Sequence, residues 1–230
     1  MIKNVVFDVS GVLVKFDIVG IWNIFGWDKN LSKEISEIIF QGEESQKYIE
    51  GKYDTLTFVK TLIKKYPKRR KEINAVFTDE FLRKLMLPNK DTYELLKELS
   101  KYYNVYILSN LYTFMMKRFY EMFGDVNDYV KGSMFSCDVK MKKPDPKIFD
   151  LFLRRFNLNP AETAFIDDTR NNIITATSKE VGIKVGIQYK YPETNSKIYA
   201  LLLKNLQADK ETDVDKTNEM PNKVSGIERV

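Results

Sequence analysis

Histidine is missing from this chain of 230 residues, and its absence removes several kinds of enzyme chemistry. A chain without imidazole cannot build a Ser-His-Asp triad, a histidine-ligated zinc site or a histidine general base. Any hydrolytic chemistry must therefore use carboxylates, lysine, hydroxyl groups or a metal ion with oxygen ligands.

Cysteine is almost as scarce, since Cys137 is the only one. One thiol cannot form an internal disulfide, and this usage is typical of a reducing compartment. Long apolar runs are also missing, because none approaches the roughly 20 residues that span a bilayer. Residues 1–14 carry Asp8 in their middle and lack the pattern of a secretory signal. We expect a cytoplasmic protein with no membrane partner.

The composition provides enough apolar material for a folded core, with 43% hydrophobic and 13% aromatic residues. Lysine and arginine number 37 against 32 acidic residues, which we interpret as a solvated, lysine-rich surface. The densest basic stretch, residues 64–71, has one aromatic residue and no glycine-rich or zinc-binding surroundings. Nucleic acid is therefore not the expected partner, and the sequence predicts no oligomeric state.

Short apolar runs alternate with helical patterns over much of the chain. The runs predict buried parallel strands at Asn4–Phe7, Val105–Leu108, Thr163–Ile166 and Lys184–Ile187. Helical spacing of apolar residues predicts helices at Asp91–Lys101, Pro146–Phe156 and Asn171–Glu180. This alternation indicates the α/β class, with a doubly wound parallel sheet.

The interval from Asp17 to Leu87 breaks the alternation, because it offers only helical patterns. We expect helices at Leu31–Phe40, Thr55–Lys65 and Arg69–Leu87, the last with a break near Thr78. A crossover between parallel strands needs only about a dozen residues, so this length predicts an inserted domain. We therefore divide the chain into a core domain (residues 1–16 and 88–206), a helical cap domain (17–87) and a disordered tail (207–230).

Polar residues follow three of the predicted strands at the point where each ends. They are Asp8, the pair Ser109-Asn110, and the pair Asp167-Asp168, while Lys143 precedes a helix. Because parallel strands end at one edge of the sheet, these groups are expected to meet in one crevice. A single aspartate at such a place is most often a helix cap, so the argument depends on their joint order.

That order resembles the four motifs of the haloacid dehalogenase-like hydrolases. The matching stretches are residues 7–13 (FDVSGVL), 108–110 (LSN), 143–149 (KPDPKIF) and 165–173 (FIDDTRNNI). The resemblance covers about residues 1–190, and one branch of the family carries its helical cap between the first two motifs. It implies a Rossmann-like core and hydrolysis at a carboxylate nucleophile.

The resemblance also implies a role for each motif residue around a Mg²⁺ ion. Asp8 would attack phosphorus and form an aspartyl-phosphate. The metal ligands would be the carboxylates of Asp8 and Asp168 and the main-chain carbonyl of Ser10, with Asp167 holding a metal-bound water. Asn172 would orient this shell of ligands from behind.

The transferring phosphoryl group would be bound by the second and third motifs. The Ser109 hydroxyl, the Asn110 main-chain N–H and the Lys143 ammonium are the expected partners of its oxygens. One departure lies nearby, since the family usually has glycine three residues before this lysine and Lys140 stands there instead. The extra cation either recruits an anionic substrate or lies in a solvated turn.

A larger departure concerns the acid–base group. The family's phosphatases carry a second aspartate in the first motif, and here that catalytic position is Ser10. Serine cannot protonate a leaving alcohol, and loss of such help typically costs about 10²–10⁴-fold in rate. Substrates with good leaving groups would depend on it least. A replacement acid is hypothesised among Asp17 and the cap carboxylates Glu43, Glu44 and Glu50.

The leading interpretation is a Mg²⁺-dependent phosphatase of small phosphorylated metabolites. One alternative is a catalytically weak or inactive protein that retains the fold to bind a ligand, which Ser10 motivates. A second alternative is a 2-haloacid dehalogenase-type hydrolase that uses Asp8 without metal, although the Asp167-Asp168 pair argues against it. Aromatic residues of the predicted cap are interpreted mainly as packing groups: Trp22, Phe25, Trp27, Phe40, Tyr48 and Phe58.

Overall fold

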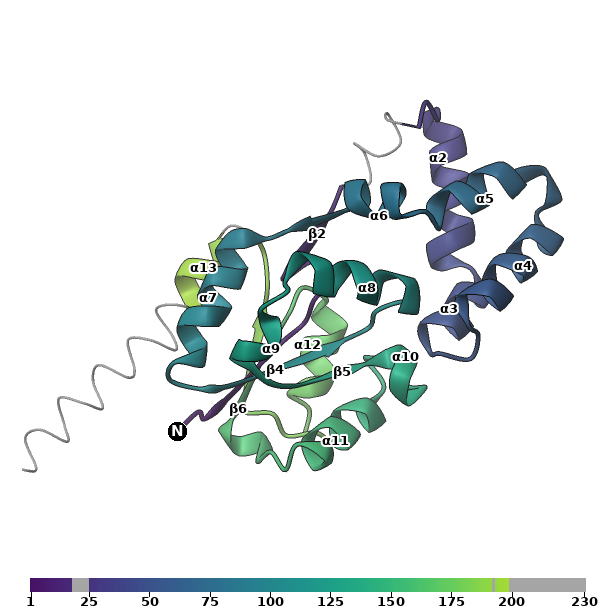
Figure 1. Ribbon diagram of the computed structural model, residues 1–230. Helices are drawn as coiled ribbons and strands as arrows, with labels where there is room; N and C mark the ends of the chain where they lie inside the picture. The colour runs from purple at the N-terminus through teal and green to yellow at the C-terminus, as the bar shows by residue number, and fades with distance from the viewer. Residues whose placement is uncertain (18–24, 192, 199–230) are drawn as a thin grey trace, which may run out of the picture.

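The computed structural model describes residues 1–17, 25–191 and 193–198 (Figure 1). The predicted tail of residues 207–230 and the side chain of Trp22 lie outside these residues. Within the described part of the chain, no helix has both the length and the apolar character required to cross a membrane.

A five-stranded parallel sheet forms the centre of the molecule, in the order β5-β4-β1-β6-β7. Every neighbouring pair of strands in it is parallel, and Val5 in the middle strand is paired with Val105 on one side and Ala164 on the other. The strands are β1 (Asn4–Phe7), β4 (Asn104–Ser109), β5 (Val130–Phe135), β6 (Thr163–Asp167) and β7 (Val185–Gln188).

Helices cover both faces of this sheet, as expected for strands that are apolar on each side. Val5 and Phe7 of β1 belong to one buried cluster with residues of α7 and α8, whereas Val6 belongs to another with residues of α11 and α12. The prediction of a doubly wound α/β fold is therefore confirmed. The helices of the core are α7 (Lys90–Ser100), α8 (Thr113–Met122), α9 (Val126–Tyr129), α10 (Ser136–Val139), α11 (Pro146–Arg155), α12 (Arg170–Ala176), α13 (Glu193–Ile198) and the 3₁₀ turn η3 (Pro160–Glu162).

Helices alone fill the described chain between the second and third strands, and we call residues 25–85 the helical insertion. In Figure 1 this insertion forms a group on the right of the sheet. Side-chain caps begin three of its helices, at Asp28, Asp54 and Thr78, so the predicted break near Thr78 is confirmed. Its elements are α2 (Lys29–Ser36), the π-helix η1 (Glu37–Gln41), α3 (Glu43–Ile49), α4 (Thr55–Lys65), the 3₁₀ turn η2 (Pro67–Arg69), α5 (Arg70–Val76) and α6 (Asp79–Leu85).

Two short strands that the sequence did not predict join the insertion to the core. They are β2 (Val14–Phe16) and β3 (Met86–Pro88), which pair in antiparallel fashion. Directly after β3, the buried Asn89 forms hydrogen bonds to the segment that precedes β2. Its backbone N–H donates to the Leu13 carbonyl and its side-chain amide to the Val12 carbonyl, each at 2.8 Å. The two connecting segments are thus fastened to each other at the edge of the core.

Helix α3 of the insertion and the turn after it are docked on the loop that follows strand β4 and on helix α10, which follows β5. The Ser45 and Tyr112 hydroxyl groups lie 2.7 Å apart, and the Ser136 hydroxyl donates to the Ile49 carbonyl at 2.7 Å. At Gly51, an added Cβ would lie 2.0 Å from the carbonyl oxygen of Cys137, so the two backbones meet closely. These contacts hold the insertion over the carboxyl ends of the strands.

Lys140 occupies a conformation that suits glycine, and this generates a stability prediction. It ends α10 with φ +56° and ψ 29°, the left-handed region that costs a side-chain-bearing residue about 1–2 kcal/mol. Lys140→Gly should therefore raise the free energy of unfolding by up to about 1 kcal/mol, after the greater entropy of unfolded glycine is subtracted. Urea titration measures this change.

Lys131→Gly is the matched control, because Lys131 is also exposed but lies in strand β5, where φ is not positive. It removes the same charge and should lower the free energy of unfolding by about 0.5–1 kcal/mol. An equal loss of stability in both variants would contradict the account given for Lys140.

Candidate active site

Asp8 lies directly after β1, at the carboxyl end of the central strand. Its backbone continues the sheet, with its N–H donating to the Ile166 carbonyl at 2.9 Å. The side chain is only 4% exposed, and its Oδ1 accepts from the Val9 N–H at 2.7 Å and lies 3.0 Å from the Lys143 Nζ. The predicted nucleophile is therefore held in one orientation by two neighbours.

Asp167 is the last residue of the adjacent strand β6 and Asp168 follows it, and the two side chains face different surroundings. Asp167 is fully buried and accepts from the Lys143 Nζ at 2.6 Å and from the Asn172 amide at 3.0 Å to both oxygens. Asp168 is exposed, and its Oδ1 accepts from the Thr169 hydroxyl at 3.2 Å. Single oxygens of Asp8, Asp167 and Asp168 all lie within 4.8 Å of one another, a spacing that one cation could share.

Gly11 brings the loop after β1 against Asp168. Its φ is +76°, and an added Cβ would lie 2.2 Å from the Asp168 Oδ2. Both the backbone conformation and the space therefore require glycine at this position. The loop containing Ser10 and Gly11 and the end of β6 thus approach closely around the same carboxylate.

Lys143 is a fully buried charge at the centre of the site. Besides its two carboxylate partners, its Nζ donates to the Leu108 carbonyl at 2.9 Å. The Asn110 side chain holds the Lys143 backbone from both sides: its amide donates to the lysine carbonyl at 2.8 Å and its oxygen accepts the lysine N–H at 2.9 Å. The prediction from the sequence motifs assigned a role only to the main-chain N–H of Asn110 and missed this side-chain contact.

Burial and mutual repulsion shift the acidity of the clustered groups. Desolvation and the neighbouring Asp167 raise the pKa of Asp8 to about 7, against the opposing effect of Lys143. Burial and Asp167 also raise the pKa of Asp168. Burial opposes the charge of Lys143, but Asp8 and Asp167 outweigh it and raise the lysine pKa. Three carboxylates with one ammonium leave excess negative charge, which suits a divalent cation.

The two serines of the predicted motifs, Ser109 and Ser10, differ in burial. The Ser109 hydroxyl is buried without a partner of good hydrogen-bond geometry, although it is close enough to Asp8 to lower that carboxyl's pKa. Ser10 is half-buried and lines a cavity beside the site. A buried hydroxyl that is not fully satisfied at such a site is available to a ligand oxygen.

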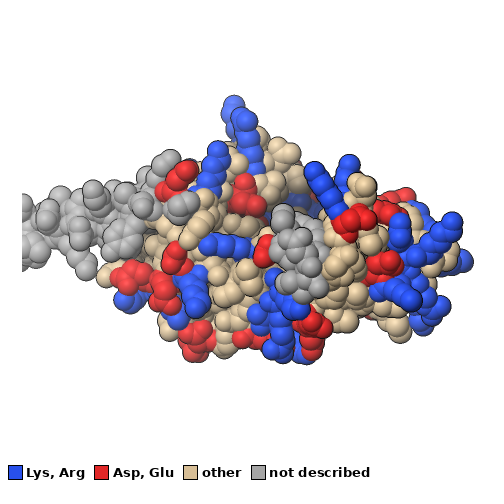
Figure 2. All heavy atoms as spheres, turned by 90° about the horizontal axis from the view of Figure 1, so that it is seen from above, with Lys and Arg blue, Asp and Glu red and all other residues tan. Residues whose placement is uncertain are grey.

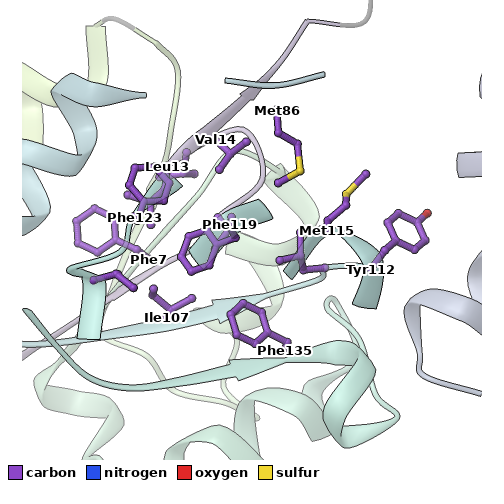
Figure 3. Close-up of a cluster of buried hydrophobic side chains, with 14 of the residues drawn as sticks. Phe7, Leu13, Val14, Met86, Ile107, Tyr112, Met115, Phe119, Phe123 and Phe135 are labelled. Carbon is purple, nitrogen blue, oxygen red and sulfur yellow. The ribbon is translucent and has the colours of Figure 1, made fainter. Parts of the chain in front are cut away.

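The cavity has a volume of about 320 Å³ and lies between the core and the helical insertion. Tyr112 and Met115, which belong to the buried cluster in Figure 3, contribute to its wall on the core side. Two of its lining residues belong to the predicted motifs: Ser10 stands two positions after Asp8, and Asn110 directly follows Ser109. The cavity therefore opens beside the predicted reaction centre.

None of the carboxylates hypothesised to replace the missing acid lines this cavity. Glu50 is paired with Lys142 at 3.0 Å, and Glu44 accepts from the Tyr53 hydroxyl at 2.8 Å. Glu43 and Asp17 are exposed. Among the described residues, the lining contains no charged side chain at all.

The surface above the insertion and core carries charges of both signs. Figure 2 shows lysine and arginine side chains interspersed with aspartate and glutamate over this face. No continuous basic surface is visible among the described residues there. The interpretation of the net charge as a solvated lysine-rich surface agrees with this view.

A parallel α/β sheet with carboxylates clustered at its strand ends is typical of one class of hydrolases. Comparison with known proteins identifies this class. A model of the haloacid dehalogenase-like hydrolases matches residues 2–178, and this chain belongs to that family. A D-ribitol-5-phosphate phosphatase from Bacteroides thetaiotaomicron is 30% identical over 213 residues, which cover 85% of this chain and 94% of the relative.

Solved structures agree with this assignment. A HAD family enzyme from Bacteroides thetaiotaomicron, in complex with magnesium and inorganic phosphate, matches with a TM-score of 0.67 and 26% identity. The match covers 84% of this chain and 96% of that one. An L-2-haloacid dehalogenase from Xanthobacter autotrophicus shares the fold at 18% identity, with a TM-score of 0.57 and coverage of 87% and 83%.

The raised pKa of Asp8 predicts how the metal-free protein responds to pH. A carboxyl whose folded pKa is about 7 favours folding while it is protonated, and this stabilisation is lost as the pH rises through 7. In EDTA at pH 8, the free energy of unfolding of Asp8→Asn should therefore exceed that of the wild type by about 1–3 kcal/mol. The difference should shrink at pH 5, as measured by urea titration at both pH values.

Asp150→Asn is the control for this comparison, because Asp150 is an exposed carboxylate on α11, away from the cluster, and is paired with the exposed Arg154. Its effect should stay within about 0.5 kcal/mol at either pH. If Asp8→Asn were less stable than wild type at pH 8, the desolvation of Asp8 would not dominate its energetics.

Proposed function

We propose that this protein is a Mg²⁺-dependent phosphatase that acts on small phosphorylated metabolites through an aspartyl-phosphate on Asp8. The observation that carries the proposal is the convergence of Asp8, Asp167 and Asp168 within 4.8 Å, with the buried Lys143 ammonium bound to two of them. The phosphatase relative and the solved neighbour with magnesium and phosphate support the same reaction class.

The carboxylates of Asp8 and Asp168 and the main-chain carbonyl of Ser10 would hold the ion, with Asp167 bound through a water molecule. The oxygen-only donor set fits Mg²⁺, which prefers carboxylate and water ligands. Asn172 fixes Asp167 by donating to both of its oxygens. When bound, the ion supplies positive charge that offsets the repulsion between carboxylates and an incoming phosphate.

The chain's own residues would then carry out a displacement in two steps. A carboxylate oxygen of Asp8 attacks phosphorus, the bond from phosphorus to the leaving oxygen breaks, and that oxygen keeps the electron pair. The Lys143 ammonium, the Ser109 hydroxyl and the Asn110 N–H bind the phosphoryl oxygens as charge develops on them. Water then attacks the same phosphorus and its proton passes to solvent, while the bond between phosphorus and the Asp8 oxygen breaks, which releases phosphate and restores the Asp8 carboxylate.

The helical insertion would act as a cap domain over this site. We propose a division into a core of residues 1–16 and 88–206 and a cap of residues 17–87, joined at the β2–β3 pair. A cap docked over the strand ends limits the access of water to the aspartyl-phosphate. A cytoplasmic location remains a prediction from the single cysteine.

A protein that binds a phosphorylated ligand without turning it over is the second candidate function. The observation that favours it is the absence of any carboxylate among the described residues that line the cavity, together with Ser10 at the acid–base position. A metal-free dehalogenase is favoured less, because clustered carboxylates at Asp167 and Asp168 would only add repulsion to a site without a cation.

Phosphate release tests the leading proposal. With Mg²⁺ present, the wild-type chain should release phosphate from 4-nitrophenyl phosphate, and EDTA should abolish the release. Asp8→Asn should lower kcat by at least about 10³-fold, because the nucleophile is removed while the shape is kept. Asp150→Asn should change kcat less than about twofold. Turnover that survives Asp8→Asn would exclude Asp8 as the nucleophile.

Substitution of Ser10 separates a phosphatase from a protein that only binds. Ser10→Asp should raise kcat on an alkyl phosphate by about 10²-fold or more, because it supplies the acid that the leaving alkoxide needs. Ser10→Asn, which adds a similar volume without an ionisable group, should produce no such gain. Equal loss of activity in both variants would show instead that the serine is adapted to its own reaction.

A further inference from the structure

The wall of the 320 Å³ cavity is dominated by apolar side chains that come from distant parts of the chain. Phe16, Leu111 and Met115 line it from the core, and Phe40, Ile49 and Leu85 from the helical insertion. An apolar cavity of about 150 Å³ is large enough to bind benzene. The cavity beside Ser10 therefore has room for a ring with substituents.

The polar groups of the wall are few, and two of them already have partners inside the protein. The Tyr112 hydroxyl lies 2.7 Å from that of Ser45, and the Asn110 side chain makes two hydrogen bonds to the Lys143 backbone. Ser10, Ser36 and Gln41 are the remaining polar lining residues. A sugar or polyol chain placed here would leave several hydroxyl groups unpaired, each at a cost of about 1–3 kcal/mol.

The described residues of the wall offer no acid to the leaving oxygen. No aspartate, glutamate, lysine or arginine lines the cavity among the described residues. The stretch from Ile18 to Ile24, outside the described residues, has the sequence IVGIWNI and contains none of these residue types. A leaving oxygen that is not protonated must be a weak base. A phenolate, with a conjugate-acid pKa of about 10, or a carboxylate, at about 4, meets this need far better than an alkoxide.

We propose that the cavity binds the apolar body of an aryl or acyl phosphate, so that the preferred substrate is a monoester of a phenol or a mixed anhydride of a carboxylic acid. This inference rests on the proposed phosphatase function. Asp8 attacks phosphorus, the bond between phosphorus and the phenolic or carboxylic oxygen breaks, and that oxygen leaves as the anion without needing a proton. The apolar lining favours an apolar body and the lack of an acid favours a weakly basic leaving oxygen, and both requirements are met by the same substrate class.

The test compares substrates that change one property at a time, using the full chain with Mg²⁺. From 4-nitrophenyl to phenyl to benzyl phosphate the ring is kept while the leaving oxygen becomes more basic. We expect kcat/KM to fall by at least about 10²-fold across this series. Benzoyl phosphate should exceed acetyl phosphate by at least about tenfold, because a methyl group leaves the cavity largely unfilled. Comparison of phenyl phosphate with benzoyl phosphate shows whether a phenolate or a carboxylate leaving group is preferred.

A binding measurement adds a readout that does not require turnover. Phenylphosphonate, which has no bond to hydrolyse, should inhibit at least about tenfold more strongly than methylphosphonate. Met115→Gln places an amide in the cavity wall and should reduce this preference severalfold. Met116→Gln is the matched control on the next position of α8, which does not line the cavity, and it should leave the preference unchanged.

Three results would overturn this inference, and they differ in whether the proposed phosphatase function fails with it. If benzyl phosphate or D-ribitol 5-phosphate were hydrolysed as fast as phenyl phosphate, the substrate class would be wrong while the phosphatase function stood. If no phosphate were released from any member of the series, both would fall. Equal inhibition by the two phosphonates would show that the cavity contributes nothing to binding.

Discussion

The ammonium group of Lys143 lies inside the protein between two carboxylates, and the arrangement of the site depends on it. It touches Asp8 after β1, Asp167 at the end of β6 and the Leu108 carbonyl in β4, so one charge joins three neighbouring strands. A buried charge is tolerated only where partners surround it. The carboxylates in turn could not remain close without this cation between them. The Asn110 side chain matters for the same reason, because it fixes the backbone from which Lys143 extends.

Much of the core could be predicted from the sequence, because its strands and helices carry strong local patterns. Strand β1 and helix α4 begin and end at the predicted residues. Strand β6 differs from its prediction by one residue at its end, and β4 and β7 differ by one residue at both ends. Strand β5 (VKGSMF) was missed, since Lys131, Gly132 and Ser133 interrupt its apolar pattern at the edge of the sheet. Strands β2 and β3 have only three residues each, which is too short for alternation to be recognised.

The candidate site was predictable where it follows the ends of strands, and less so where it depends on contacts between distant side chains. The motifs placed Asp8, Asp167 and Lys143 together, as the structure does. Nothing in the local sequence around Asn110 indicates that its amide binds a backbone 33 positions away. In the insertion, most aromatic residues pack internally as expected, with the rings of Tyr48 and Phe58 stacked at 4.3 Å. Phe40 lines the cavity instead, and its direction could not be derived from helical spacing.

The hydrogen bonds from Asn89 to the Val12 and Leu13 carbonyls link the position of the helical insertion to that of the active-site loop. Both segments that carry the helical insertion are anchored to the loop in which Gly11 rests against Asp168. If the insertion tilted relative to the core, it would strain these hydrogen bonds. Any such movement is therefore expected to shift the loop that contains Gly11.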